Sequence, residues 1–441
     1  MIKTKISIVL LILIFGVNIS AAADIITDKL DEMMVKYDKV KLFSGVVLLA
    51  KDGNIVYEKP FGYADWEKKT PVNKETLFNI ASITKMFTAT MIMQLEKEGK
   101  LSLSDPLNKF VNIYPDNIGS KITIDMLLNM KAGLGDYLMD PAYNRNMSKF
   151  TNVDAYLDLI KNEPLLFEPG TDTRYSNSGY AVLGGVIEKA TSKTYVENLK
   201  ERILDPLGMK NSFFKQISDV YPNTATPTSI DFSGNKHNMK IEASPSGAGG
   251  IFTNVEDLFK LDTYIRSSKI LGEGARAGGT PGWNSVFAQY KDGYTLIVFS
   301  NFGKAAEEIE SRFRKIKSDE EYAAPSITVE MKFYKILNEE GISALSAGLK
   351  KTLEENDLEY NDMHLNKFGY QLVEAGEMDK AIQVFKLNTE LFPDIANTYD
   401  SLAEAYMNNG NKELAIKNYK KVLELRPQNE NAKKMIEMLQ K

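Results

Sequence analysis

Cysteine is absent from the 441 residues of this chain, and histidine occurs only twice. Without cysteine the chain forms no disulfide and carries no lipid-attachable cysteine, so burial of apolar side chains has to hold the core. His237 and His364 each stand alone in a polar stretch. We therefore expect no metal site, and a Ser-His-Asp triad is excluded. The glycine pairs at 249–250 and 278–279 lack the context of a nucleotide-binding loop, so no cofactor is expected.

Positive charge is also scarce. The formal net charge is −5, and no basic run extends beyond short lysine pairs. Nucleic-acid-binding domains usually carry a basic face or stripe, so we expect no nucleic-acid partner. The chain is 43% hydrophobic and 26% charged, which is ordinary for a globular protein and excludes a disordered or fibrous one. Its length indicates two or three domains.

Long apolar runs are missing everywhere except at the start of the chain. Lys3 and Lys5 precede an apolar stretch at residues 6–19, and three alanines follow at residues 21–23. This order predicts a cleaved signal peptide, residues 1–23, and thus a bacterial protein that is exported to the periplasm or secreted. The alternative is an uncleaved membrane anchor, but no stop-transfer pattern follows the stretch. After cleavage we expect no contact with a membrane.

Strand signals stand at both ends of the segment 24–316. Apolar residues recur at helical spacing over residues 26–37, and two β-branched runs then flank Asp52-Gly53, a hairpin turn signal. A second hairpin of this form turns at Asp292-Gly293. Helices and loops fill the interval. We therefore expect an α+β fold, an antiparallel sheet flanked by helices, in which the two ends of the segment lie side by side.

The last hundred residues repeat themselves at an offset of 34. The following pairs keep the same or a similar residue: Leu372 and Tyr406, Gly376 and Gly410, Ala381 and Ala415, Phe385 and Tyr419, Pro393 and Pro427. This period and pattern are typical of tetratricopeptide repeats. We expect an α-helical repeat domain over residues 327–441, with a degenerate first repeat and a C-terminal capping helix. The polar residues 317–326 are the expected linker.

One stretch carries a candidate nucleophile. Ser82 lies three residues before Lys85 in "FNIASITKMFTA", and the same spacing recurs at Ser212 and at Ser233. A lysine one helical turn from a serine can take its proton when burial lowers the pKa of the lysine. Only Ser82 precedes an apolar helix that would bury such a lysine. Ser233 lies among turn residues, and Ser212 lies in a short aromatic stretch, so we interpret both as structural.

Two further elements supply groups that such a serine needs. Tyr175 and Asn177 precede a helix, where a tyrosine with a depressed pKa can act as a general base and an asparagine can hold a substrate amide. Another Tyr-x-Asn at Tyr221 contains proline and suits a loop. The glycine-rich segment from Arg276 leads into the second hairpin. Its glycines let a substrate backbone approach a strand edge, and the arginine can bind a carboxylate.

In this order the three elements resemble the serine β-lactamase and D-alanyl-D-alanine peptidase superfamily, in particular its class C-like branch. The phrases "TLFNIASITKMFTA", "EPGTDTRYSNSGYAVLG" and "GGTPGWNS" carry the likeness, and related phrases follow the family's order over nearly all of residues 40–302. The resemblance implies a β-lactamase/transpeptidase-like fold. The tetratricopeptide tail also resembles appendages of some exported bacterial members.

The resemblance implies a role for each position of the motifs. Ser82 would be the acylated nucleophile and Lys85 its activating partner. Tyr175 would shuttle protons, and Asn177 would hold the substrate's amide. The backbone N–H groups of Ser82 and Gly279 would form an oxyanion hole, in which each donor contributes about 3 kcal/mol to the transition state.

Some positions depart from the family's pattern. The triplet Arg276-Ala277-Gly278 has an arginine where relatives usually carry lysine or histidine, so it keeps a cation for a substrate carboxylate but loses a titratable group. Met130 and Ala132 stand where the branch commonly has histidine and serine. The connection ahead of Gly278 has only about ten residues where relatives usually have several dozen, so the pocket wall beside Arg276 is expected to be missing or rebuilt.

Three functions fit these observations. The first is an exported serine hydrolase that forms an acyl-enzyme with an amide or ester (a β-lactam, a D-alanyl peptide or a simple ester) and binds a protein partner through its repeats. The second is a catalytically weak, β-lactamase-like binding protein that recognises a peptide or cell-wall fragment and recruits a partner through its repeats. The third is a structural adaptor, which only the helical tail supports.

Overall fold

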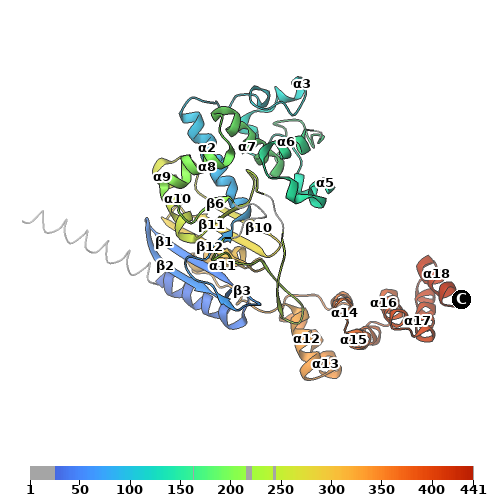
Figure 1. Ribbon diagram of the computed structural model, residues 1–441. Helices are drawn as coiled ribbons and strands as arrows, with labels where there is room; N and C mark the ends of the chain where they lie inside the picture. The colour runs from blue at the N-terminus through green and yellow to red at the C-terminus, as the bar shows by residue number, and fades with distance from the viewer. Residues whose placement is uncertain (1–24, 162, 215–220, 242–244, 441) are drawn as a thin grey trace, which may run out of the picture. The chain divides into compact units, whose positions relative to one another are not determined.

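The chain forms two compact units (Figure 1). The computed structural model describes residues 25–161, 163–214, 221–241 and 245–440. The first unit contains the residues up to Ser229 and Lys236–Pro325, and the second contains Ile230–Asn235 and Ser326–Lys441. The predicted signal peptide, residues 1–23, lies outside the described residues. Among those that are described, every helix is too short or too polar to cross a membrane.

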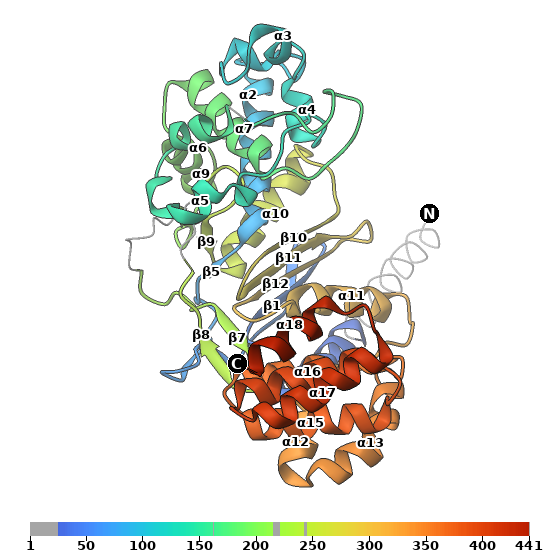
Figure 2. The same ribbon diagram turned by 90° about the vertical axis from the view of Figure 1, so that its right-hand side faces the viewer.

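A five-stranded antiparallel sheet is the centre of the first unit (Figure 2). Its strands, in spatial order, are β10 (Ala275–Thr280), β11 (Trp283–Gln289), β12 (Tyr294–Ser300), β1 (Gly45–Lys51) and β2 (Asn54–Phe61). The two predicted hairpins are present. Asp52 and Gly53 both adopt positive φ, at 50° and 80°, as a tight two-residue turn requires. Because β1 pairs with β12, Gly45 lies opposite Ser300, and this confirms that both ends of the segment share the sheet.

Helices cover both faces of this sheet. Val46 and Leu48 of β1 pack into one apolar core with α2 (Thr84–Lys97) and α10 (Val255–Ser268). Val47 and Leu49, on the opposite face, pack into a second core with the helix at residues 25–40 and with α11 (Ala305–Lys317). All four valine and leucine side chains are fully buried. A strand buried on both faces reads as a continuous apolar run, as β1 does, rather than as an alternating one.

The chain between β2 and β10 builds a mostly helical region beside the sheet (Figure 1). Its helices are α3 (Asp116–Gly119), α4 (Ile124–Leu128), α5 (Pro141–Arg145), α6 (Val153–Ile160), α7 (Asn177–Thr191), α8 (Tyr195–Leu199) and α9 (Asp205–Leu207). Its short strands are β3 (Tyr63–Asp65), β4 (Thr70–Pro71), β5 (Phe78–Asn79), β6 (Phe213–Phe214), β7 (Thr228–Ile230), β8 (Lys236–Asn238) and β9 (Ile251–Thr253). The α+β fold class is thereby confirmed.

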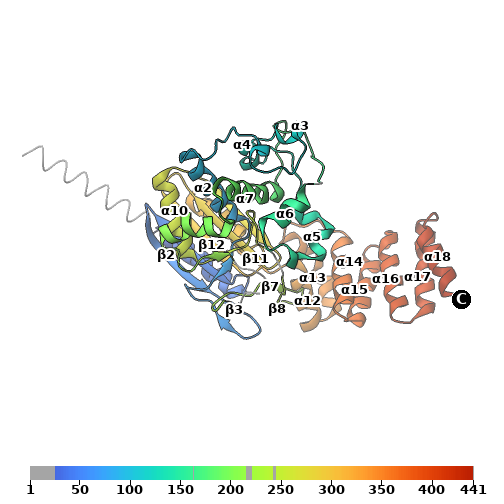
Figure 3. The same ribbon diagram turned by 45° about the horizontal axis from the view of Figure 1, so that its top comes forward.

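The second unit is a stack of antiparallel helices (Figure 3). They are α12 (Val329–Glu339), α13 (Ile342–Glu354), α14 (Met363–Glu374), α15 (Met378–Leu391), α16 (Ala396–Asn408), α17 (Lys412–Leu425) and α18 (Glu430–Leu439). Of the residues that define the predicted repeat, Leu372, Ala381, Phe385, Tyr406 and Ala415 lie in one apolar core. A side chain at Gly369 would come within 2.4 Å of the Phe385 ring, so that aromatic ring requires a glycine on the neighbouring helix. The sequence did not indicate that Phe232, far from the repeats in the chain, packs in this unit against Tyr334 and Phe368.

Candidate active site

A tight turn presents Ser82 at the start of helix α2. The preceding residue, Ala81, has a positive φ of 45°, and the turn is a single 3-10 turn, Ala81–Ile83. The Asn79 side chain accepts a hydrogen bond from the Ala81 N–H at 2.8 Å, and the Ile80 carbonyl accepts one from Ser285 at 3.0 Å. A non-glycine residue at positive φ costs about 1–3 kcal/mol and persists only where its surroundings impose it. The position of this serine is therefore obtained at a cost in folding free energy.

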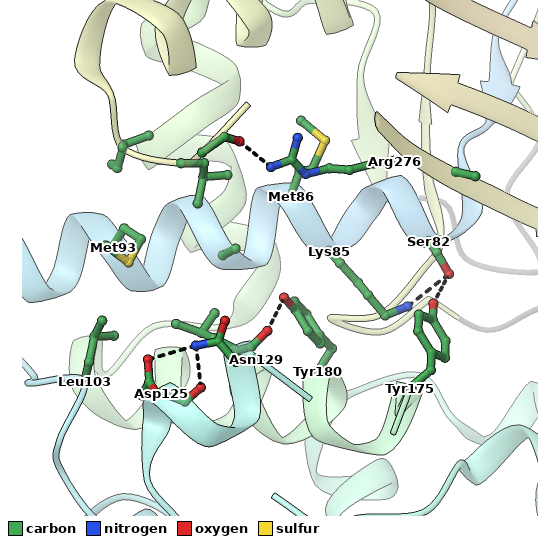
Figure 4. Close-up of a pocket in the computed structure, with 16 residues that line it drawn as sticks. Ser82, Lys85, Met86, Met93, Leu103, Asp125, Asn129, Tyr175, Tyr180 and Arg276 are labelled. Carbon is green, nitrogen blue, oxygen red and sulfur yellow. Dashed lines mark hydrogen bonds between the residues drawn. The ribbon is translucent and has the colours of Figure 1, made fainter. Parts of the chain in front are cut away.

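Lys85 lies buried one helical turn after Ser82 (Figure 4). Its Nζ is 3.0 Å from Ser82 Oγ, 2.7 Å from Asn177 Oδ1 and 2.9 Å from the Ala248 carbonyl. Burial lowers the pKa of Lys85 to about 7, against a smaller opposing effect of the Asp136 charge. Near neutral pH a large share of this lysine is therefore an uncharged amine.

The partners of that amine determine where its lone pair points. The Asn177 and Ala248 oxygens can only accept hydrogen bonds, so they engage the two N–H groups of the neutral amine. The lone pair then faces Ser82 Oγ, the third partner. In this state the serine hydroxyl donates to the lysine nitrogen, which is the geometry of proton removal.

Asp136 fixes the Asn177 amide in the orientation that this arrangement needs. The Asp136 carboxylate accepts a hydrogen bond from Asn177 Nδ2 at 2.8 Å, so the amide oxygen is turned toward Lys85. Asp136 also accepts the Leu138 N–H at 3.0 Å. Sequence reasoning missed this residue, because the comparison with the family's pattern in this segment covered Met130 and Ala132 and ended before Gly135-Asp136. The available signal was an aspartate directly ahead of a short helical turn, where such residues cap backbone N–H groups.

Tyr175 brings a second hydroxyl to Ser82. Its side chain is 53% exposed, yet its hydroxyl points inward and lies 2.6 Å from Ser82 Oγ (Figure 4). Ser176, next in the chain, caps helix α7 through the Gly179 N–H at 2.9 Å, which fixes Tyr175 just outside the helix. Burial of the hydroxyl end raises the pKa of Tyr175, although the Ser82 hydrogen bond acts in the opposite direction. A raised pKa favours the protonated hydroxyl, which can donate a proton, so the geometry suits Tyr175 as a proton donor better than as a general base.

Strand β10 approaches the turn at Gly278. A side chain there would come within 2.2 Å of the Ile80 carbonyl and 2.9 Å of the Ser82 nitrogen, so only glycine allows the contact. The close approach at this position is thus made by the chain's own turn and not by a substrate backbone. Gly279, the next residue, lines the cavity at Ser82.

Arg276 belongs to the same strand but points along helix α2 toward Met86 (Figure 4). Its guanidinium donates hydrogen bonds to the Gly272 carbonyl at 2.6 Å and to the Gly274 carbonyl at 3.3 Å. Burial lowers the pKa of the Arg276 guanidinium, and the neighbouring Tyr180 opposes this. The arginine therefore lines the cavity on the side of Met86, and its remaining donors are available to a ligand there.

The two other Ser-x-x-Lys matches have ordinary structural surroundings. The Ser212 hydroxyl is buried between Thr253 and Asp257, at 2.7 and 3.0 Å, and its lysine, Lys215, lies outside the described residues. The Ser233 hydroxyl donates to Asp231 at 2.6 Å within a turn. Both structural interpretations are consistent with these contacts.

Two cavities meet at Ser82 and Tyr175. One, of about 550 Å³, extends along helix α2, and we call it the α2 groove. Its lining residues are Ser82, Lys85, Met86, Ala89, Met93, Leu103, Asp125, Leu128, Asn129, Tyr175, Tyr180, Ile270, Leu271, Gly272, Arg276 and Ala277. The other, of about 370 Å³, contains Asn177, Gly279 and Glu307. The predicted site residues other than Gly278 therefore line one or both of two cavities that meet at the nucleophile.

Comparison with known proteins agrees with this geometry. The sequence profile of the Beta-lactamase family matches residues 29–299, and that of the tetratricopeptide repeat matches residues 396–429. A penicillin-binding protein of Bacillus subtilis (strain 168) is 36% identical over 43% of this chain and 40% of its own length. The teichoic acid D-alanine hydrolase of Staphylococcus aureus (strain MRSA252) is 28% identical over 53% of this chain and 57% of its own length. The chain thus matches about half of these relatives.

Solved structures show the same fold. The penicillin-binding protein of Bacillus halodurans superposes with a TM-score of 0.59 over 64% of this chain and 98% of its own, at 22% identity. A class C beta-lactamase superposes with a TM-score of 0.56 over 68% of this chain and 97% of its own, at 18% identity.

Proposed function

Because this chain belongs to the β-lactamase family, we propose that it is a serine hydrolase that forms an acyl-enzyme at Ser82 with an amide or ester. The observation that carries the proposal is the hydrogen-bonded set of Ser82, Lys85 and Tyr175, with the serine 3.0 Å from the lysine nitrogen and 2.6 Å from the tyrosine hydroxyl. A hydroxyl flanked by a base and a donor is the arrangement that nucleophilic catalysis requires.

In the first step the Ser82 oxygen attacks the carbonyl carbon while its proton moves to the neutral amine of Lys85. The carbonyl oxygen becomes an anion, for which the N–H groups of Ser82 and Gly279 are the proposed donors. The tetrahedral intermediate then breaks its bond to the leaving group, which takes a proton from the Tyr175 hydroxyl. The Lys85 ammonium restores that proton. What remains is an ester between Ser82 and the acyl group.

In the second step water replaces the leaving group. It attacks the ester carbon and gives up a proton along the reverse path, so that the acid is released and the Ser82 hydroxyl re-forms. Asn177 performs two roles in this scheme. It positions the Lys85 amine and presents its amide beside the acyl group. The substrates that the family's chemistry allows are a β-lactam, a D-alanyl peptide or a simple ester, with Arg276 as the cation for a substrate carboxylate.

The remaining parts of the proposal rest on the sequence. We propose that residues 1–23 are a signal peptide, that residues 24–316 form the hydrolase and that residues 327–441 form the repeat domain, joined by the linker 317–326. The leader pattern supports the signal peptide. The lack of helix or strand over residues 318–328 supports the linker. Export to the periplasm or medium, and a protein partner for the repeats, belong to this proposal.

The test is covalent labelling of the folded full chain with a fluorescent penicillin and, separately, with a fluorophosphonate. We expect at least one probe to label the protein, and Ser82→Ala to abolish labelling. Ser233→Ala is the matched control, because it removes a partly exposed serine with the same spacing to a lysine, and it should label normally. If neither probe labels folded wild-type protein and no ester is turned over, the chain is a binding protein instead.

A further inference from the structure

We propose that the α2 groove binds a linear apolar chain attached directly to the scissile ester or amide. The inference rests on the proposed function, since it takes Ser82 as the reacting group, and it names a substrate class for that site. The groove begins at Ser82 and continues away from it, so whatever occupies the groove is joined to the bond under attack.

The floor of the groove is one face of helix α2. Met86, Ala89 and Met93 follow Ser82 at intervals of four, three and four residues, which places them in one row. The helix rises about 1.5 Å per residue, so Met93 lies about 16 Å farther along its axis than Ser82. All three side chains are apolar and line the cavity (Figure 4). The row is long enough for an extended chain and offers it no hydrogen bond.

The walls of the groove continue this apolar character. On one side the connection between α10 and β10, residues 269–274, is short and places Ile270 and Leu271 at the cavity. On the other side Leu103 and Leu128 line it. These four side chains are only partly buried, so a ligand can reach them and remove their remaining surface from water.

Most polar groups along the groove already have a partner in the protein, and the remaining donors of Arg276 are the exception. Asn129 donates its amide to the Asp125 carboxylate at 2.9 Å and to the Asp125 carbonyl at 3.1 Å. The Tyr180 hydroxyl donates to the Leu128 carbonyl at 3.1 Å. Arg276 uses part of its guanidinium to bond two backbone carbonyls beside Met86, and its methylene stem adds apolar surface to the groove. A hydrophilic substituent would therefore gain little along this path, whereas a methylene chain would gain burial.

The experiment measures kcat/KM for two ester series with the full chain. In p-nitrophenyl acetate, butyrate, octanoate and dodecanoate the chain is on the acyl side. In n-butyl, n-octyl and n-dodecyl acetates it is on the alcohol side, and released acid is titrated. All are used below their aggregation concentrations. Burial of one methylene corresponds to about a fourfold gain, so we expect a rise of at least 100-fold from the shortest to the octyl member of one series. The series that rises identifies the side on which the chain is attached.

Three variants locate the effect. Ala89→Leu narrows the middle of the groove, and Met93→Gln makes its far end polar, so each should reduce the ratio of dodecyl to butyl activity at least tenfold. Met363→Gln makes the same exchange at an exposed methionine of the repeat unit and should leave the ratio unchanged. If one groove variant fails to fold, the other still decides.

Each outcome separates this inference from the proposed function. If kcat/KM stays level or falls with chain length in both series, while turnover depends on Ser82, the proposed hydrolase is supported and the proposal of an apolar groove is refuted. If no ester reacts and Ser82 takes no label, binding of dodecanoate and butyrate to the full chain is measured by calorimetry. The proposal is supported if dodecanoate binds at least tenfold tighter than butyrate and Met93→Gln weakens this binding. Equal binding of the two acids would refute it.

Discussion

Replacing Asp136 with asparagine should shift the pH dependence of acylation to lower pH. The charge of Asp136 raises the pKa of Lys85 against the larger, opposite effect of burial, so its removal favours the neutral amine. The exchange also leaves one oxygen to serve two donors, Asn177 Nδ2 and the Leu138 N–H. If Asn177 turns its amide over in response, Lys85 loses an acceptor, and this disfavours the ammonium as well. Both consequences lower the same pKa.

The size of the shift follows from the separation of the charges. Two hydrogen bonds of 2.7 and 2.8 Å and the Asn177 amide lie between the ammonium and the carboxylate. At about 7 Å, two unit charges interact by about 2.4 kcal/mol at an effective dielectric of 20, or about 1.7 pH units. Asp136 is partly exposed, so screening by water reduces this to about 1 pH unit.

The assay is the rate constant for Ser82 labelling, or kcat/KM for a short ester, between pH 5 and 9. In the wild type the rate should rise about tenfold per pH unit at low pH and level off above a pKa of about 7. Asp136→Asn should level off about 1 pH unit earlier, at a lower plateau because the amine is a weaker base. Asp140→Asn makes the same exchange at a carboxylate that caps α5 and should move the midpoint much less. An unchanged or raised midpoint in Asp136→Asn would refute the reasoning.

Three further predictions concern other parts of the chain. Tyr175→Phe should lower kcat/KM by about 10²–10⁴-fold and keep the pH midpoint, because it removes the proton donor but not the base. Burial raises the pKa of Glu163 to about 7, so its protonated form is favoured in the fold and stability falls as pH rises from about 4.5 to 7. Glu163→Gln should thus stabilise by about 1–2 kcal/mol at pH 8 but not at pH 4.5 in urea titrations, whereas exposed Glu168→Gln should change neither value. Gly369→Ala, which forces a methyl group into the Phe385 ring, should destabilise the repeat unit by about 1–3 kcal/mol in thermal melts. Gly348→Ala, in the open interior of α13, should stabilise it by about 0.5–1 kcal/mol, and the opposite order of melting points would contradict the packing argument.

Much of the fold follows from local signals in the sequence. The Asp-Gly pairs mark both hairpins because few residues other than glycine, asparagine and aspartate tolerate positive φ. The period of 34 identifies the repeats because each repeat packs the same side chains against the next. The Ser82–Lys85 pair was separated from its two competitors by helix context alone, since only an apolar helix buries a lysine.

What the sequence did not indicate depends on contacts between distant segments. Asp136 is connected to Lys85 by two hydrogen bonds through the Asn177 amide. Neither residue spacing nor composition predicts such an indirect contact. The direction of the Arg276 side chain depends on carbonyls of a short connection whose path is set by the sheet. The place of Phe232 in the core of the repeats has no local signature, because its partners are about 100 residues or more away in the chain.

The pairing of β1 with β12 imposes an order on folding. Lys51 of β1 lies opposite Tyr294 of β12. During synthesis about 240 further residues must therefore be added, which takes about 12–50 s at typical elongation rates, before β1 can pair with β12. Throughout that interval one edge of a mostly apolar strand offers unpaired N–H and C=O groups to any other chain. The sheet beside Ser82 is therefore also a part of the nascent protein that is exposed to misassociation. Slower synthesis or higher chain concentration should lower the yield of folded protein before either affects the stability of molecules already folded.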